Sequence, residues 1–326
     1  MKIGVFSILF NDLPLEDVLS YLSRQQIHTI ELGTGGYSRS NHVDVPALLH
    51  SETERLRFSE LLKRYGFSIS GLGTQGNPVH PDPEQAKRYH HDFVQTVLLA
   101  EKLKVDTVLV LSGCPGGRKE DRTPNWITCP WPEDYSKALE YQWEEVLIPY
   151  WHQAAAFAEE HGVTKLAMEP HPGFAVYNAD TLLKLRSHTS PVIGANFDPS
   201  HFFWQGIDPC IAIEELGKSI YHVHAKDCYV YPERVRRSGV LNPQPYSDFS
   251  QRSWNFRTVG YGHSAEVWNN IISILSEIGY DGVISVEHED ALMTREEGLS
   301  KAIHLLSECF IREYPQTKWW ELRPEG

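Results

Sequence analysis

The sequence predicts a single closed (β/α)8 barrel over residues 1–326. First, a chain of 326 residues fits one α/β barrel of about 250 residues with insertions. Second, short apolar runs alternate strictly with segments of helical period, which is typical of parallel strands joined by helical crossovers. Third, no GxGxxG motif follows the first strand, and this disfavours an open dinucleotide-binding sheet.

Eight segments have the composition of short, buried strands. They are rich in Val, Ile and Leu, which favour parallel strands covered on both faces. In chain order they are Lys2–Ile8, Thr29–Thr34, Ser68–Gly73, Asp106–Ser112, Lys165–Pro170, Ile193–Asp198, Ile220–Ala225 and Gly282–Glu287.

Helical segments lie between these strands. Asp12 and Ser264 stand where helix N-caps are expected, and Gly66 and Gly279 stand where a helix gives way to a left-handed residue. Apolar residues recur at three- and four-residue spacing most clearly in Leu15–Gln25, Ala47–Gly66 and Glu84–Leu103.

Two of the predicted connections are unusually long, Gly113–Pro132 and Asp227–His263. Loops that follow the fourth and seventh strands of a barrel lie on the face where active sites form. We therefore expect a lid, a wall of a binding site or an interface with a partner chain. The aromatic residues that favour this over a simple surface loop are Trp126, Trp131, Tyr246 and Trp254.

Composition narrows the class of partner. The formal net charge is −13, with 43 acidic and 30 basic residues, and this balance repels a phosphate backbone, so we expect no nucleic-acid partner. No run approaches about 18 apolar residues, so we expect no membrane span.

Five scattered cysteines without a CxxC pair indicate reduced thiols. The N-terminal apolar run is too short for a signal peptide, and we expect a cytoplasmic protein.

Acids and imidazoles gather where the last four predicted strands end. Because residues two apart in a strand share a face, the members of each pair can project together into the barrel mouth. Several unpaired carboxylates there would repel one another, and a divalent cation would relieve this. The segments are Glu169-Pro170-His171, Asn196-Phe197-Asp198, His222-Val223-His224 and Glu287-His288-Glu289.

A set of two Glu, one Asp and one His offers oxygen and nitrogen ligands but no sulfur. Such a set suits Mn²⁺, Mg²⁺ or Co²⁺ in an open site, with water or substrate completing the shell. Zn²⁺ is a further candidate, although the excess of carboxylates makes it less favoured. We expect Mn²⁺ ahead of the others. Any one of these acids alone would more often be a helix cap or an ion-pair partner, but four at the same barrel end are not explained in that way.

The motifs resemble those of the xylose isomerase-like barrel superfamily of sugar-phosphate isomerases and epimerases. The resemblance covers nearly the whole chain, from the first strand to a helix expected to end near Tyr314. In that family a metal is held by a Glu after strand five, an Asp after strand six, the second His of an HxH motif in strand seven and a Glu after strand eight. The residues that match, in MEPHP, NFDPSH, HVHAKD and SVEHED, are Glu169, Asp198, His224 and Glu287.

The resemblance also implies a type of chemistry. The metal would chelate two adjacent sugar oxygens and stabilise the enediolate that forms when a base removes the proton α to a carbonyl. Glu169 and Glu287 would flank the sugar and exchange protons on its two faces. From this enediolate the reaction can end in epimerisation, in aldose–ketose isomerisation or in loss of a β leaving group.

The chain departs from the ketose 3-epimerases of this superfamily at two places. Their strand-five Glu is followed by Leu-Asn-Arg, whereas Glu169 is followed within two residues by His171-Pro172-Gly173-Phe174. They also carry an Arg six residues after the metal His, where this chain has Val230. Both departures remove groups that hold a free ketose, so simple ketose epimerisation is disfavoured.

The motifs Glu-x-His-Pro, FDPSHFFWQG and HVHAKD are similar to those of another branch, the α subunits of C-glycoside deglycosidases and related lyases of 3-oxo-glucosides. The resemblance implies that the 3-oxo group acidifies the C2 proton and that the aglycone on C1 leaves, with a small β subunit or a homo-oligomer as the expected assembly. His171 is expected to be a catalytic base or acid, or else to orient Glu169. His201 and Lys226 are expected to bind substrate hydroxyls, and Asp227 to orient a neighbour.

Three other readings remain open. An epimerase or isomerase of keto-sugars, inososes or 3-oxo-glycosides would use the same enediolate. A phosphodiesterase of the AP endonuclease type shares the barrel, but it needs more histidines and a basic groove, which the net charge disfavours. A barrel that binds a sugar or a partner chain without chemistry is disfavoured by the complete set of four metal ligands.

Overall fold

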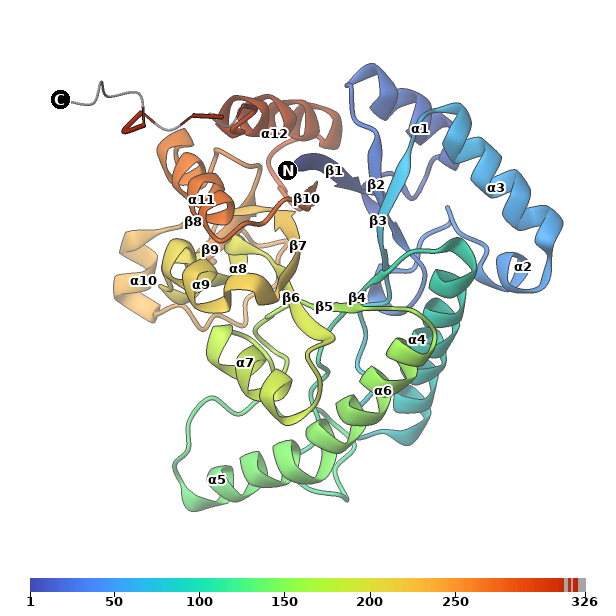
Figure 1. The fold of residues 1–326 in the computed structure, drawn as a ribbon. Helices are drawn as coiled ribbons and strands as arrows, with labels where there is room; N and C mark the ends of the chain where they lie inside the picture. Colours follow the sequence, from blue (N-terminus) through green and yellow to red (C-terminus); the bar gives the residue numbers. More distant parts are fainter. Residues whose placement is uncertain (314–315, 318, 322–326) are drawn as a thin grey trace.

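Eight parallel strands close into a barrel with helices around its outside (Figure 1). The computed structural model describes residues 1–313, 316–317 and 319–321. The strand order is β1-β10-β7-β6-β5-β4-β3-β2, and the barrel closes where Lys2 to Val5 of β1 pair with Val283 to Val286 of β10. The predicted (β/α)8 fold is confirmed.

All eight predicted strands are present, but most of them are shorter than predicted. The first ends at Phe6, because a 3₁₀ turn over Ser7–Phe10 follows it. The fifth ends at Met168, two residues before Pro170, which has no N–H to donate to the ladder. The bounds are β1 (Lys2–Phe6), β2 (Thr29–Gly33), β3 (Ser68–Gly73), β4 (Thr107–Val110), β5 (Lys165–Met168), β6 (Ile193–Phe197), β7 (Ile220–Ala225) and β10 (Val283–Val286).

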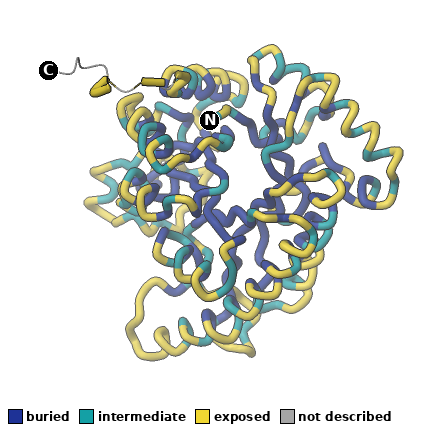
Figure 2. The backbone as a smooth tube through the Cα atoms, in the orientation of Figure 1, coloured by how far each residue is buried: buried dark blue, intermediate teal, exposed yellow. Residues whose placement is uncertain are grey.

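The helices cover the barrel with their apolar faces inward. In α1, Leu15, Val18, Leu19 and Leu22 are buried while the opposite face is exposed, and Figure 2 shows buried strands inside a rim of half-exposed helices. A π-helical stretch, Tyr141–Leu147, joins α5 to α6. The bounds are α1 (Leu15–Arg24), α2 (Val45–His50), α3 (Glu52–Arg64), α4 (Pro83–Leu103), α5 (Glu133–Glu140), α6 (Ile148–Glu160), α7 (Ala179–His188), α8 (Pro199–Gln205), α9 (Pro209–Leu216), α10 (Pro232–Ser238), α11 (Ala265–Glu277) and α12 (Arg295–Cys309). None of the helices in the described part of the chain is long and apolar enough to span a bilayer.

Two helix predictions were wrong in detail. The helix predicted over Ala47–Gly66 is two helices, because the Ser51 hydroxyl accepts the N–H of Glu54 and starts α3 anew. Asp12 is not an N-cap: α1 begins after Pro14, and Asp12 instead forms an ion pair with Arg295.

The remaining predictions concern one helix N-cap, two glycines that follow helices and the end of the last helix. Ser264 occupies the N-cap position of α11, although its side chain makes no capping hydrogen bond. Gly66 and Gly279 follow α3 and α11 with φ of +73° and +81°, which glycine adopts without strain. The last helix ends at Cys309, and Tyr314, near which it was predicted to end, lies outside the described residues.

The long connection after β7 contains structure that the sequence did not reveal. Two strands, β8 (Asp227–Val230) and β9 (Trp254–Arg257), pair in antiparallel register on either side of α10. The hairpin packs on α8 through a small core of its own, formed by Trp204, Cys228, Trp254 and Phe256. This core explains why so long a segment is ordered beside the barrel mouth.

Asp227 ties the two ends of this connection together. Its fully buried carboxylate accepts the backbone N–H groups of Cys228, Gly260, Gly262 and His263 at 2.8–3.2 Å. It also accepts the ring N–H groups of His263 at 2.7 Å and Trp268 at 3.2 Å. A carboxylate that accepts this many N–H groups is compensated for its burial and fixes the loop that supplies them.

An Asp227→Asn variant is expected to lose about 3 kcal/mol of stability, because an amide nitrogen would face N–H donors in a buried site. Hydrogen exchange should speed up across residues 254–263 more than in the barrel strands. Glu233→Gln, on the exposed face of α10, is the matched control. Equal exchange in the variant and the control would contradict this role.

Candidate metal centre and substrate pocket

Four side chains converge at the carboxyl-terminal mouth of the barrel. One ligand atom from each of Glu169, Asp198, His224 and Glu287 lies within 4.8 Å of the others. Glu169 and Glu287 directly follow β5 and β10, Asp198 is the N-cap residue before α8, and His224 belongs to β7. The structure thus brings together the four residues that the motifs predicted.

The geometry of this set fits a divalent cation. Three carboxylates and one imidazole supply hard oxygen and nitrogen donors without sulfur. One oxygen of Asp198, Oδ1, accepts the N–H of Ser200 at 2.9 Å, which leaves Oδ2 buried without a hydrogen bond. A buried carboxylate oxygen is costly unless a cation faces it, and in this structure the ammonium of Lys226 faces Oδ2.

Lys226 lies among the same carboxylates. Its Nζ is 3.0 Å from Asp198 Oδ2, outside hydrogen-bonding geometry, 2.8 Å from Glu287 Oε2 and 3.1 Å from Glu289 Oε2. Burial lowers the pKa of Lys226, but these three carboxylates outweigh it and hold the pKa well above its usual value. A charged ammonium therefore contacts two oxygens that a metal ion would also use.

The two glutamates of the set differ in acidity. Burial raises the pKa of Glu169 to about 7, against the opposing effect of Lys226. Burial also acts on Glu287, but Lys226 and His224 hold the pKa of that carboxyl well below its usual value. Glu287 is therefore held in its ionised form, while the pKa of Glu169 lies near neutral.

Glu31 supports the site from beneath, and the sequence analysis missed it. Glu31 is fully buried in β2, and its Oε2 lies 2.9 Å from Nε2 of His224. An N–H donated from Nε2 leaves Nδ1 of His224 free to face Glu287, 3.1 Å away, and the other ligands. Burial disfavours a charged His224, but Glu31 and Glu287 raise its pKa well above the usual value. The one available signal was an acid inside an otherwise apolar strand.

His222 and Asn196 also lie in the barrel interior. The Nδ1–H of His222 donates to Oδ1 of Asn196 at 3.0 Å, and its Nε2 lies 3.8 Å from Glu31. The amide of Asn196 lies 3.4 Å from Oε2 of Glu169. His222 is therefore outside the set of four, and Asn196 links it to Glu169.

His171 lies beside the candidate centre with one free nitrogen. Its Nδ1–H donates to the carbonyl of Pro172 at 2.7 Å, so Nε2 of the neutral ring carries the lone pair. Burial, followed by His201, lowers the pKa of His171 to about 4. His171 is therefore neutral at pH 7, and its role as base, acid or orienting residue stays a prediction.

His201 contacts the carboxylates directly. Its Nε2 is 3.0 Å from Glu169 Oε1 and 3.4 Å from Asp198 Oδ2, and its ring centre is 4.0 Å from that of His171. Burial lowers its pKa to about 4. These contacts suit orientation of Glu169, and substrate contact by His201 stays a prediction.

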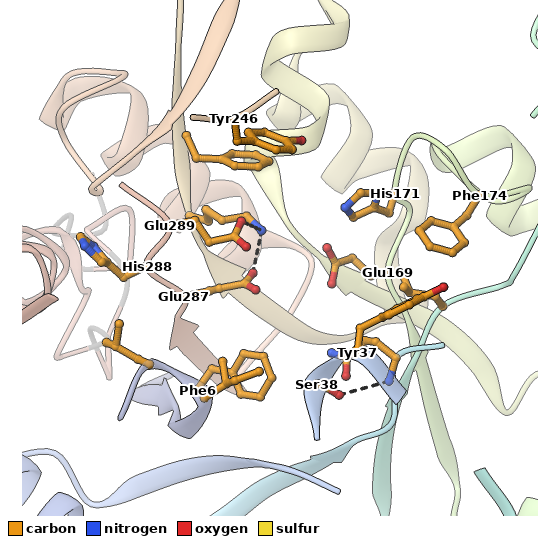
Figure 3. Close-up of a pocket in the computed structure, with 16 residues that line it drawn as sticks. Phe6, Tyr37, Ser38, Glu169, His171, Phe174, Tyr246, Glu287, His288 and Glu289 are labelled. Atoms are coloured by element: carbon orange, nitrogen blue, oxygen red, sulfur yellow. Dashed lines mark hydrogen bonds and ion pairs between the residues drawn. The ribbon is translucent and has the colours of Figure 1, made fainter. Parts of the chain in front are cut away.

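A cavity of about 630 Å³ opens over the candidate centre, and we call it the metal-side cavity. Figure 3 shows Glu169 and Glu287 on opposite sides of its space, with Tyr37, Phe174 and Tyr246 on the walls. His171 and Lys226 also line it. A cavity with few polar groups on apolar walls is typical of a small-molecule site.

Comparison with known proteins shows the family to which this chain belongs. The sequence pattern of the family described as xylose isomerase-like TIM barrel matches residues 27–309. The chain belongs to the xylose isomerase-like TIM-barrel family. Two of the similar proteins described below are named as dehydratases.

Similar proteins come from both sequence and structure. The uncharacterized protein YfiH of Bacillus subtilis is 37% identical over 94% of this chain and 99% of its own length. Inosose dehydratase 2 of Bacillus cereus is 27% identical over 52% of this chain and 55% of its own. The probable 3-DHS dehydratase AsbF of Bacillus anthracis superposes with a TM-score of 0.66 at 17% identity, covering 94% of this chain and 99% of its own.

A further solved structure contains a metal. The IolI protein, with a bound zinc atom, superposes with a TM-score of 0.63 at 18% identity, covering 95% of this chain and 99% of its own. At 18% identity, this structural similarity shows a shared fold and nothing about function. The cluster of Glu169, Asp198, His224 and Glu287 is what makes a divalent ion fit this chain.

A Glu31→Gln variant is expected to bind Mn²⁺ about tenfold more weakly, because the charge that orients His224 is lost. Isothermal titration on the folded variant would measure this. Glu52→Gln, exposed at the start of α3, is the matched control. Unchanged affinity would show that Glu31 does not position His224.

A Lys226→Met variant is expected to bind Mn²⁺ at least about tenfold more tightly than the wild type. The substitution removes a positive charge that lies within 3.0 Å of two of the ligand oxygens and repels a cation. Lys218→Met in the turn before β7 serves as the control. Weaker binding in Lys226→Met would mean that the lysine organises the ligands instead of competing for them.

Proposed function

We propose that this protein is a divalent-metal-dependent lyase that removes the proton α to the carbonyl of an oxidised sugar and then expels the group on the next carbon. The preferred substrate is a 3-oxo-glucoside, and the group expelled is its aglycone, by cleavage of a carbon–oxygen or carbon–carbon bond. The observation that carries the proposal is the convergence of the four ligand candidates at one point, where two of them, Glu169 and Glu287, line a cavity together with His171.

The side chains support each step of such an elimination. A bound divalent ion would supply electrophilic polarisation of the carbonyl. Glu169 or the free Nε2 of His171 takes the C2 proton, and the electrons of that bond form the C1–C2 double bond as the bond to the aglycone breaks. The same side chain can return the proton to the departing group. Lys226 is placed to donate to substrate oxygens.

Two relatives support elimination as the outcome. Inosose dehydratase and 3-DHS dehydratase are named for the removal of water. Loss of water next to an acidified carbon is the same elimination with a smaller leaving group. The substitution of His171-Pro172-Gly173 for the residues that hold a free ketose in epimerases points in the same direction.

A second candidate is epimerisation or isomerisation of a keto-sugar, an inosose or a 3-oxo-glycoside. The observation in its favour is that Glu169 and Glu287 lie on opposite sides of the cavity, where they could exchange protons on both faces of a ring (Figure 3). A small partner subunit or self-association also remains a proposal for this chain.

The test uses Mn²⁺-loaded protein and 4-nitrophenyl 3-oxo-β-glucoside in D₂O, followed by NMR and absorbance. Release of nitrophenol above the protein-free rate, abolished by EDTA, is the expected result. Deuterium at C2 with the aglycone retained would favour the epimerase. If neither occurs, oxidised glycosides are the wrong substrate class.

A His171→Ala variant is expected to lower kcat by about 10²–10⁴-fold while its Mn²⁺ affinity stays unchanged, because the proposal gives His171 a proton transfer and assigns the metal to the other four residues. Steady-state kinetics and titration calorimetry on the same preparation would measure both. His188→Ala, exposed at the end of α7, is the control. A parallel loss of metal affinity would instead assign His171 to orienting Glu169.

A further inference from the structure

The wall of the metal-side cavity is acidic. Three carboxylates, Glu169, Glu287 and Glu289, line it, and Lys226 is the one lysine or arginine among the described residues that do so. An anionic group on a ligand therefore finds a single permanently charged cationic side chain in this cavity. The surroundings of Lys226 decide whether that side chain is available to it.

Glu289 differs from the other two carboxylates. It belongs to none of the candidate ligand clusters found in the described part of the chain. Its side chain is 48% exposed, against 6% for Glu169 and 15% for Glu287. Figure 3 shows Glu289 beside Glu287 on one wall of the cavity. Of the three carboxylates, Glu289 is therefore the one that an entering ligand meets first.

The ammonium of Lys226 contacts three carboxylates and an aromatic ring. Its Nζ lies 2.8 Å from Glu287 Oε2, 3.0 Å from Asp198 Oδ2 and 3.1 Å from Glu289 Oε2. The centre of the Phe256 ring lies 4.7 Å from the same nitrogen. A phosphate or carboxylate that approaches Lys226 therefore competes with Glu289, the most exposed of these partners.

The pair formed by Lys226 and Glu289 suits a neutral hydroxyl group. An ammonium donates and a carboxylate accepts, whereas a hydroxyl group can do both, so one hydroxyl can contact both side chains without separating them. A phosphate or carboxylate can accept from Lys226, but it displaces Glu289 and leaves that carboxylate unpaired beside Glu287. The pair therefore favours uncharged groups over anionic ones.

We propose that Glu289 is a specificity residue that restricts this wall of the metal-side cavity to uncharged hydroxylated ligands. Sugars that present a phosphate or a carboxylate to this wall are excluded, because Glu289 occupies the ammonium of Lys226. The inference rests on the proposed function for the place of the sugar, and it narrows the substrate to a neutral one.

The test titrates the fully Mn²⁺-loaded protein with sodium sulfate and, separately, with sodium acetate at pH 8 and low ionic strength, followed by calorimetry. The two anions are small probes for a phosphate and a carboxylate. Glu289→Gln is expected to bind both at least about tenfold more tightly than the wild type, because a repelling charge is gone and Lys226 has lost one charged partner. Glu214→Gln, exposed in α9, is the matched control and should bind like the wild type.

A double variant tests the part that Lys226 plays. In Glu289→Gln/Lys226→Met, the gain in anion affinity should disappear, because the ammonium that receives the anion is gone. Equal affinity for the anions in the wild type and Glu289→Gln would overturn the role of Glu289. A gain that persists in the double variant would also overturn it, because Lys226 would then not be the group that Glu289 withholds.

The proposed function and the role of Glu289 can fail separately. Anion binding needs no turnover, so the expected pattern of variants without nitrophenol release would keep the role of Glu289 and reject the lyase. Release of nitrophenol together with equal anion affinity in the wild type and Glu289→Gln would keep the lyase and reject the role of Glu289.

Discussion

The excess of buried negative charge at the barrel mouth is the constraint on which the site depends. Four buried or nearly buried carboxylates, Glu31, Glu169, Asp198 and Glu287, face two cationic groups, Lys226 and His224. Burial, with the neighbouring carboxylates of Glu287 and Asp198, raises the pKa of Glu169 to about 7 against the opposing effect of Lys226 and His224.

The connections that follow the strands add outer walls around this charged centre, and two adjoining cavities result. The barrel strands position the carboxylates, whereas the connection after β7 supplies Tyr246, Trp254 and Arg252 on the outer walls. His171 stands where the two cavities meet, with its Nδ1 held by the carbonyl of Pro172. The ligand candidates and the outer walls of the cavities thus come from different segments of the chain, as is common in barrels.

The sequence was enough to predict the fold and the four converging residues, because the carboxyl ends of parallel strands must meet at one mouth. It was not enough for Glu31, whose partner His224 is far away in the chain and whose strand otherwise reads as apolar core. The β8–β9 hairpin was missed for the same reason: Asp227 pairs with Arg257 across a segment with no short turn between them. Asp12 was misassigned because only the fold shows Arg295 beside it.

The way in which Asp227 gathers both ends of its connection has an evolutionary consequence. Residues 231–253 leave and re-enter the barrel through one fixed point, since the carboxylate binds the start and the end of the segment. Insertions, deletions or exchanges within that stretch can alter the outer of the two cavities, which residues 240–246 help to line, while the ligand cluster keeps its geometry. During evolution, this one segment can therefore be replaced and the shape of the outer cavity changed, while the strands that carry the ligand candidates stay the same.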